Sequence, residues 1–495
     1  MTKDESGFRV LYIALALGAL GDGLLRVSPL GLNAFLWIAL FCASTLWLGR
    51  RSHVEHGPAL RWLGVVALLF AAAIAWRDSS TIKFLAIFGI FGAFALSYLT
   101  ARGNSLRDAG IWQYIAAGLA SALSVLAGLP PLIASDLEFK SEEAIARKAK
   151  INAAGVGLLI SVPVLAIFAT LLVSADDAFR QLASNFLSVS IPDLFVHLLI
   201  IVIFAWCTAG YLRGLTTDKG PLGRLPRPPR LAQAGIIEIG LPLALLDVLF
   251  LLFVIVQFKY FFGGSNHVQS TAGLVYSEYA RRGFFELVTV AALVLPLLLL
   301  SYNLLDKTDP KHERVFRVIA GAQVLLVFVI MVSAFLRMRL YQQEYGMTEL
   351  RLYTVAFMVW LAAVFICFVF TVLRSRTAGF AFSSLVSAFV VGAGLVVINP
   401  DGFIVKTNAA RAAAGRPFDI TYNSNLSADA VPALIDALPL LAPGDRARLA
   451  ARLLLQSPNS NGDWRAWSLS RHNARVAIES HITELQQLVT VVPPG

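Results

Sequence analysis

Charged side chains at the ends of long apolar runs are the residues of this sequence with the clearest chemical potential. Glu278 and Arg282 are four residues apart, so helical geometry would place them on one face, with Arg281 turned aside. Glu286 follows one turn later, inside the apolar run, where a carboxylate needs a partner such as Arg282. The spacing predicts either a carboxylate–arginine site or arginines that anchor a span, with one supporting ion pair.

Two adjacent aspartates form a second candidate site. Asp176 and Asp177 follow Ser174 at the exit of an apolar run, which is a pattern that caps helices. Apolar residues from Phe179 to Phe186 then recur at helical spacing and predict an amphipathic helix on the membrane surface. The two interpretations are a capped interfacial helix and a binding or coupling role for the paired carboxylates.

Asp247 lies midway along an apolar run and is the strongest candidate for a proton, ion or substrate site inside the membrane. Ionisable side chains at this depth face a bundle interior, a cavity or one another. An interhelical hydrogen bond would satisfy Asp247 equally well. Other ionisable residues of the apolar runs are His197, Glu238, Lys259 and Arg337, and the last three lie near the ends of their runs.

The composition excludes a soluble globular protein. Of the 495 residues, 57% are hydrophobic and 15% are charged, and the mean hydropathy is +0.70, whereas soluble domains are about 25% charged. The net charge of +10 comes from cations in short loops, without the basic stripe of a nucleic-acid-binding protein. We therefore expect the lipid bilayer, and not nucleic acid, to be the main partner.

Enzyme and metal motifs are absent from the sequence. The three cysteines, Cys42, Cys207 and Cys367, each lie inside an apolar run, and the seven histidines are scattered without ligand spacing. The sequence contains no P-loop, zincin helix or nucleophile elbow. It therefore predicts no metal site, no cofactor and no catalytic residues, and favours a non-enzymatic role.

Apolar runs long enough to cross a bilayer, which takes about 20 helical residues, occur twelve times. They predict an all-α polytopic transmembrane helical bundle, with N-terminal transmembrane helices over 1–110, a helical core over 111–398 and a C-terminal helical extramembrane domain over 399–495. The runs are 10–25, 30–48, 60–76, 82–100, 111–133, 153–174, 194–212, 236–262, 284–305, 316–337, 352–373 and 380–398.

Loop charges give conflicting orientations for the two halves of the chain. Cytoplasmic loops retain Lys and Arg. This rule puts the N-terminus in the cytoplasm and also, in the second half, the loops at 140–150, 213–230, 307–314 and 374–376. The conflict disappears if 111–133, broken by Pro130 and Pro131, is re-entrant or interfacial. The alternative is that the N-terminal bias is overridden. With the second-half charges, the C-terminal domain is extracytoplasmic.

The C-terminal hundred residues carry helix signals. Asn399 and Pro400 form an N-cap followed by a first-turn proline, and Gly415 ends that helix. Further helices are expected over 427–437, 446–456 and 463–489. We expect this domain to contribute to one polar network with the loops that carry the candidates above, through Asn408, Arg411, Asp419 and Asp429.

Several of these motifs resemble one bacterial family of polytopic membrane proteins that is known only as a domain of unknown function. They are Asp176–Phe179, Glu278–Leu287, the Asn399-Pro400-Asp401 turn followed by Asn408, Arg411 and Asp419, and Leu426–Pro432. The resemblance covers about 110–440 and implies a multi-pass protein of the bacterial inner membrane, without an activity.

Three classes of function fit the sequence. A non-enzymatic envelope sensor, regulatory or assembly factor would use the polar network as a closed structural lock, with an envelope protein or a small molecule as possible partner. A transporter of a small solute or ion would have a cavity that reaches Asp247 at the midplane. A membrane-embedded enzyme would have an open polar cleft at the membrane face.

Overall fold

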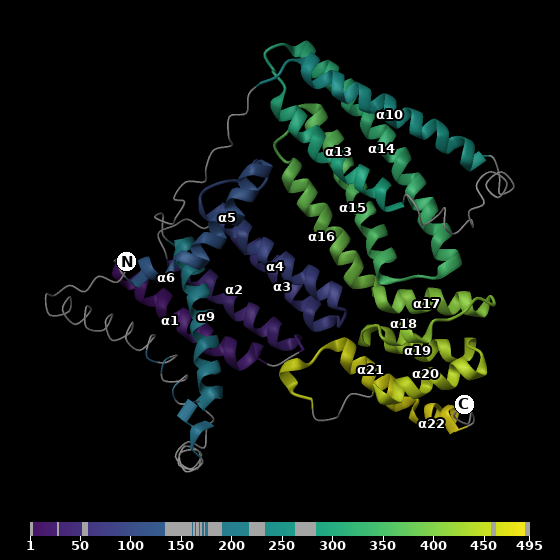
Figure 1. Ribbon diagram of the computed structural model, residues 1–495. Coiled ribbons are helices and arrows are strands. Elements are labelled where there is room, and N and C mark those ends of the chain that lie inside the picture. The colour runs from purple at the N-terminus through teal and green to yellow at the C-terminus, as the bar shows by residue number, and fades with distance from the viewer. Residues whose placement is uncertain are drawn as a thin grey trace.

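Long apolar helices make up two bundles that stand side by side above a tail of shorter helices (Figure 1). The tail comprises the described residues from Pro400 to Thr490; the end of each bundle next to it is called the tail-facing end, and the opposite end the far end. The structure is a computed structural model that describes residues 3–26, 29–51, 58–133, 191–216, 233–262, 284–456 and 462–490, with single positions between 161 and 176.

The first bundle is formed by the helices of the N-terminal part of the chain. α1 packs along α9 and α3 packs along α4, and the rings of Phe41, Phe94 and Tyr211 meet at centroid distances of 4.9–5.5 Å in the core. The helices are α1 (Lys3–Leu25), α2 (Leu32–Arg51), α3 (Pro58–Trp76), α4 (Ser80–Ala101), α5 (Ile111–Ala127), α6 (Leu129–Pro131) and α9 (Ile191–Thr216).

The second bundle is built around α14, whose N-cap Asp309 accepts a hydrogen bond from the Lys311 amide at 2.8 Å. Phe316, Phe365 and Phe368 are fully buried in its core. An isolated bridge between Ala234 and Leu305 ties the start of α10 to the turn between α13 and α14. The helices are α10 (Ile236–Phe262), α13 (Phe284–Leu304), α14 (Pro310–Tyr345), α15 (Glu349–Thr371) with η2 (Val372–Arg374), and α16 (Phe380–Ile398).

Ten helices of the described part of the chain are long and apolar enough to cross a bilayer. Their outer faces expose large apolar side chains such as Phe88 at 72% and Leu245 at 61%, which water would disfavour and lipid accepts. The predicted all-α polytopic bundle is therefore confirmed. Of the twelve predicted spans, 153–174 lies almost entirely outside the described residues, and 111–133 corresponds to the shorter helix α5.

Helix α5 begins and ends at the same end of the first bundle. Near its start, the Tyr114 hydroxyl donates to the Leu106 carbonyl at 2.7 Å. Near its end, the Ser124 hydroxyl donates to the Tyr98 hydroxyl at 3.1 Å, and Tyr98 lies in the last turn of α4. Gly128 then lies against Gly210, close to the end of α9. This arrangement supports the re-entrant or interfacial interpretation of 111–133.

The tail is an array of short helices with its own apolar core, which includes Val405, Leu434 and Leu449. The predicted caps are confirmed: Asn399 accepts from the Gly402 amide at 3.2 Å, and Gly415, at φ +81°, follows the end of α17. The predicted single helix over 463–489 is wrong, since it is three pieces. The elements are α17 (Pro400–Ala413), α18 (Ile420–Ser424), η3 (Ala428–Ala430), α19 (Val431–Ala437), η4 (Leu438–Leu440), α20 (Pro443–Leu455), η5 (Trp464–Ala466), α21 (Leu469–Ser480) and α22 (Ile482–Thr490).

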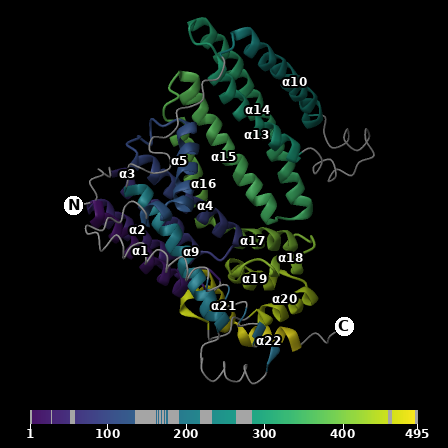
Figure 2. The ribbon, with the colours of Figure 1, turned by 60° about the vertical axis from the view of Figure 1, so that its left-hand side comes forward.

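The tail lies across the ends of both bundles (Figure 2). In the first bundle it contacts the α1–α2 and α3–α4 turns, where the Trp467 carbonyl accepts from the Leu32 amide at 2.8 Å. In the second bundle it contacts the α14–α15 turn, where the Met347 amide donates to Asn408 at 2.7 Å. Helices α5 and α9 pack beside α1–α4. The division predicted from the sequence instead placed both of them in a helical core over 111–398.

Candidate functional site

The carboxylate of Asp429 is the centre of the contact between the tail and the first bundle. Its side chain is only 1% exposed and accepts hydrogen bonds from the Asp78 amide at 2.6 Å and the Ser79 amide at 2.9 Å. The Ser470 hydroxyl of α21 also bonds to it. We call this set of contacts the Asp429 joint. Charge-assisted bonds to backbone amides are among the stronger ones in proteins, so the joint fixes the tail on the α3–α4 turn.

Arg77 supplies the positive charge of the Asp429 joint and links a third element to it. Its Nη1 lies 3.2 Å from Asp429 Oδ1. Its Nε and Nη2 donate to the carbonyls of Val396 and Val397 at 2.7 and 3.2 Å, at the C-terminal end of α16. A cation at a helix C-terminus satisfies carbonyls that have no partner within the helix. One guanidinium thus joins the first bundle, the last span and the tail.

A second ion pair supports the same turn. The Asp78 carboxylate lies 2.6 Å from Lys83 Nζ and bonds to Arg471 of α21. Burial opposes the ionisation of Asp78, but the hydrogen bond and charge of Lys83 and the charge of Arg471 together hold the pKa of Asp78 below its usual value. Asp78 is therefore a carboxylate at neutral pH, and it holds α21 against the α3–α4 turn.

Asn408 is the centre of the contact between the tail and the second bundle. Its side chain is 5% exposed; Oδ1 accepts from the Met347 amide at 2.7 Å and Nδ2 donates to the Met347 carbonyl at 3.0 Å. Nδ2 also donates to Asn423 of α18 at 3.0 Å. We call these contacts the Asn408 joint. They satisfy the buried side-chain amide of Asn408 in the way that pairing between two β-strands satisfies a backbone amide and carbonyl.

Arg411 extends the Asn408 joint to the end of α14. Its guanidinium donates to the carbonyls of Gln343 and Glu344 at 3.0 and 2.7 Å. Gly346 makes this approach possible, because a Cβ there would lie 2.7 Å from Arg411 Nη1 and 2.8 Å from Asn408 Oδ1. Its backbone, with φ +79° and ψ 178°, is also in a region that only glycine readily adopts. The turn is thus shaped to receive the tail.

Asp401 is a buried carboxyl beside the Asp429 joint. Ser427 donates to its Oδ2 from both the amide and the hydroxyl, whereas Oδ1 is buried with no hydrogen-bond partner among the described residues. Burial raises the pKa of Asp401 to about 6, and the nearby negative charges of Glu349 and Asp429 act in the same direction, against the Ser427 bonds. Asp401 is therefore a carboxyl group that titrates near neutral pH.

The other predicted site residues are placed differently. Asp419 is exposed and caps α18 by accepting from the Tyr422 amide at 2.9 Å. Glu286 is exposed in the first turn of α13, and Asp176 is exposed. Asp177, Glu278, Arg281 and Arg282 lie outside the described residues. The structure thus brings Asn408 and Arg411 to one joint and Asp429 to the other.

Asp247 lies in the middle of the candidate span Ile236–Gln257 and is half-buried. Its Oδ1 is buried and has no hydrogen-bond partner among the described residues. Within that same part of the chain, no three His, Cys, Asp or Glu side chains gather closely enough to hold a metal ion. A polar side chain that sequence reasoning did not select is Gln323, which is fully buried on α14, the helix that packs along α10.

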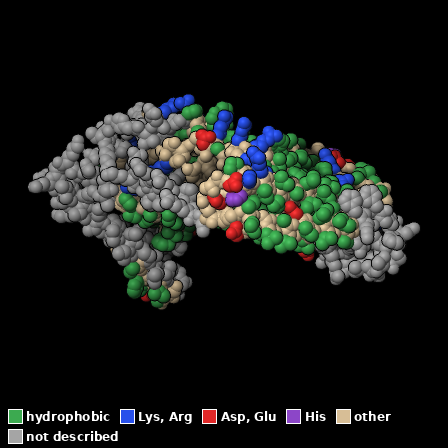
Figure 3. Space-filling model, turned by 90° about the horizontal axis from the view of Figure 1, so that it is seen from above, with side chains coloured by type: hydrophobic (Ala, Val, Ile, Leu, Met, Phe, Trp, Pro, Cys, Tyr) green, Lys and Arg blue, Asp and Glu red, His purple; other side chains and the backbone are tan. Residues whose placement is uncertain are grey.

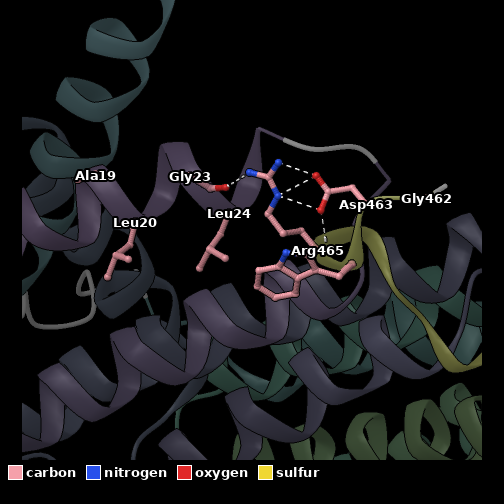
Figure 4. A pocket seen from close by; sticks show the side chains of 8 residues that line it. Ala19, Leu20, Gly23, Leu24, Gly462, Asp463 and Arg465 are labelled. Atoms are coloured by element: carbon pink, nitrogen blue, oxygen red, sulfur yellow. Dashed lines mark hydrogen bonds and ion pairs between the residues drawn. The ribbon is translucent and has the colours of Figure 1, made fainter.

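An open recess lies between α1 and the segment that leads into α21 (Figure 4). Leu20 and Leu24 line one wall, and Asp463, Trp464 and Arg465 line the other, around a volume of about 800 Å³. Arg465 pairs with Asp463 at 2.5 Å and donates to the Gly23 carbonyl. The recess is at the tail-facing end of α1, away from mid-span, so it does not reach Asp247.

Comparison with protein families gives a match over residues 64–437 to the family described as "Domain of unknown function (DUF4153)". The chain belongs to the DUF4153 family. The resemblance to a family known only as a domain of unknown function is thereby confirmed, and the matched region contains every motif on which that resemblance rested, from Asp176 to Pro432. No curated protein and no solved structure matches the chain. This DUF4153 protein joins its tail to both helix bundles through the Asp429 and Asn408 joints.

The two joints hold parts of the molecule together by charge and hydrogen bonding. Sequence reasoning selected Asn408, Arg411 and Asp429 from the tail motifs but missed Arg77 and Asp401. Asp401 was recognised only as part of a turn. The signal available for Asp401 was its position after an N-cap and proline, where first-turn acids are common because of the helix dipole.

Proposed function

We propose that this DUF4153 protein is a non-enzymatic sensor, regulatory or assembly factor of the bacterial inner membrane, with its tail outside the cytoplasm. The observation that carries the proposal is the burial of Asp429 beneath Arg77, the Asp78 and Ser79 amides and Ser470. A carboxylate so enclosed cannot also serve a diffusing substrate. It serves instead as the lock between the tail and the membrane helices.

The lock has the properties that a regulated contact needs. It joins elements that are distant in sequence. Removing one partner of a buried ion pair costs about 3–5 kcal/mol, which is enough to shift the tail from a docked to a released state. The recess beside Arg465 and the two joints all lie where the tail meets the tail-facing ends of the bundles. A partner or ligand that binds the tail there would act directly on the joints.

The charge distribution supports an extracytoplasmic tail. Cations gather at the far end, where Figure 3 shows Lys and Arg side chains over the described surface, and cytoplasmic loops are the ones that retain such charge. A reporter that is active only in the cytoplasm, fused after Gly495, should be inactive; activity would reverse the orientation. The far-end cations include Arg50, Arg61, Arg102, Arg107, Arg213, Lys307, Lys311, Arg314, Arg374 and Arg376.

Deletion of the gene in its source organism, followed by complementation, tests the function. We expect Asp429→Ala to fail to restore the envelope phenotype at normal abundance in the membrane, whereas Arg416→Ala, which removes an exposed tail pair with Glu344, restores it. A lock-based role also predicts that Asp247→Asn complements. Full complementation by Asp429→Ala together with failure of Asp247→Asn would overturn the proposal in favour of transport, the second candidate, which the mid-span carboxyl favours.

A further inference from the structure

The recess between α1 and η5 has a charged wall that neither joint uses. Arg465 Nε and Nη2 donate to Asp463 Oδ2 at 2.9 and 2.5 Å, and Nη1 donates to the Gly23 carbonyl (Figure 4). The hydrogen bonds from Arg465 hold the pKa of Asp463 below its usual value, so both charges are present at neutral pH. In the described part of the chain these bonds leave N–H groups on both terminal nitrogens free, because a guanidinium has more donors than they use.

The opposite wall of the recess continues the lipid-facing surface of α1. Ala19 and Gly23, which line the recess, belong to one exposed face of this candidate span, Gly7–Leu25. Residues of that face recur at helical spacing: Tyr12, Ala16, Ala19 and Gly23. From Tyr12 to Gly23 the helix rises by about 16 Å, close to half of the hydrocarbon thickness of about 30 Å. One acyl chain of one leaflet therefore fits along this face.

The recess lies at the depth where a bilayer changes from hydrocarbon to headgroups. Its α1 residues belong to the last two turns of the span, and Leu20 is 43% exposed there. Trp464 also lines the recess and is 60% exposed, which suits the membrane interface, where tryptophan is enriched. The charged wall thus stands at headgroup depth and the apolar wall at acyl depth, in a space of about 800 Å³. A phospholipid presents these two chemistries in the same order.

The charge of the wall sets the class of headgroup. Asp463 and Arg465 together have no net charge, so a headgroup that is itself a zwitterion pairs with both, phosphate to guanidinium and ammonium to carboxylate. An anionic headgroup lacks the ammonium, and a choline headgroup has no N–H to donate to Asp463. We propose that the recess binds a phospholipid of the ethanolamine type, with its phosphate on Arg465, its primary ammonium on Asp463 and an acyl chain along α1.

A lipid in the recess would adjoin the Asp429 joint. Arg471 bonds both to the Ala466 carbonyl of η5 and to Asp78, and Ser470 bonds to Asp429. A bound lipid would hold η5 in place and with it the start of α21. This ligand class deepens the proposed function, and its effect on the joint rests on that function. Binding itself does not require the lock, so complementation by Asp429→Ala and lipid binding can fail separately.

Native mass spectrometry of the purified full-length protein in detergent tests the lipid class. Dioleoyl phosphatidylethanolamine, phosphatidylcholine and phosphatidylglycerol are added separately over the same concentration range. We expect the first phosphatidylethanolamine to bind about tenfold more tightly than either other lipid, because only its headgroup makes both charged hydrogen bonds. Equal affinity for the three lipids, or tighter binding of phosphatidylglycerol, overturns the proposal.

Two variants locate the binding in the recess. In Gly23→Leu the new side chain enters the recess, because a Cβ there meets no atom within 4 Å, and both charged side chains stay in place. We expect the preference for phosphatidylethanolamine to disappear. Gly64→Leu on α3 is the matched control, since a Cβ at that position also meets no atom within 4 Å, and it should keep the preference. The same preference in both variants would place the lipid elsewhere and overturn the proposal.

The roles of the carboxylate and of the acyl chain are tested separately. Asp463→Asn keeps an oxygen to accept from the Arg465 amide but loses the negative charge, so phosphatidylethanolamine should bind about tenfold more weakly, as phosphatidylcholine does. An unchanged preference would exclude Asp463 as the ammonium partner. Phosphoethanolamine, which has the headgroup without acyl chains, should not displace the lipid at equal concentration. Displacement would show that the recess takes a soluble zwitterion and not a phospholipid.

Discussion

Arg77 Nη1 and Asp429 Oδ1 lie 3.2 Å apart in a buried ion pair, although 352 residues separate them in the chain. Around this pair meet the α3–α4 turn, the end of α16 and two elements of the tail. Because the tail also holds the α14–α15 turn through Asn408, it connects the two helix bundles at one end. Loss of either joint should therefore loosen the tail before it affects the spans.

Removal of the Asp429 carboxylate should release the tail from the first bundle. Asp429→Ala leaves the Arg77 charge and two turn amides without their acceptor, so we expect a loss of about 3–5 kcal/mol in the stability of docking. The measurement is the rate of protease cleavage within the tail in sealed membranes. Arg416→Ala is the control, since that exposed pair is worth under about 1 kcal/mol. Equal cleavage of both variants would contradict a lock at Asp429.

Substitution of Gly346 should disturb the Asn408 joint alone. In Gly346→Ala the new Cβ would lie within 3 Å of Arg411 and Asn408, and the backbone conformation would be strained by about 1–3 kcal/mol. We expect faster cleavage near α17 and unchanged insertion of the spans. Gly415→Ala has a similar positive φ, +81°, but meets no atom within 4 Å. If the two variants behave alike, backbone strain and not the contact with the tail explains the effect.

Acidification should stabilise the folded protein between about pH 7 and pH 4. The folded-state pKa of Asp401 is raised to about 6 from 3.8, so its contribution is fully present below the unfolded pKa and is lost as pH rises through the folded pKa. The difference corresponds to about 3 kcal/mol. Asp78, whose pKa is lowered, loses its contribution only at more acidic pH.

Asp401→Asn isolates this pH dependence. The variant keeps the shape of the side chain but cannot titrate, so its thermal stability and tail cleavage should be nearly constant over the same range. Wild-type protein should melt at higher temperature at about pH 5 than at about pH 7.5. A wild-type curve with the opposite slope, or an equal slope in Asp401→Asn, would show that another group controls the pH dependence of stability.

The elements of the fold were predictable from local signals. Apolar run length identified the spans because a helix is the way a chain segment satisfies its backbone in lipid, and Asn399 with Pro400 marked the start of the tail because these residues favour a helix N-terminus. The break in the helix at Pro130 was also predictable, since proline interrupts helical hydrogen bonding. These features each depend on a few neighbouring residues.

The contacts of the candidate site were not predictable in the same way. Asp429 was selected from a tail motif, but nothing local to Arg77 indicates that it meets the tail, because that contact depends on how the bundles are arranged. Asp401 gains its raised pKa from burial by other elements, which a single sequence does not display. The predicted partners at Glu278–Arg282 lie outside the described residues, so that part of the network stays a prediction.

The path of α5 gives a topological prediction. Because α5 starts and ends at the far end of the first bundle, the α4–α5 and α13–α14 loops should face the same side of the membrane, and the tail the other. Single cysteines are placed at exposed Ser105, Thr308 and Gly444, in a background where Cys42, Cys207 and Cys367 are replaced by Ala. A membrane-impermeant maleimide added to sealed, right-side-out vesicles should label Gly444→Cys alone. In inverted vesicles, the same reagent should instead label Ser105→Cys and Thr308→Cys. Labelling of Ser105→Cys together with Gly444→Cys would mean that α5 crosses, which would separate Tyr98 from Ser124 and contradict the arrangement of the first bundle.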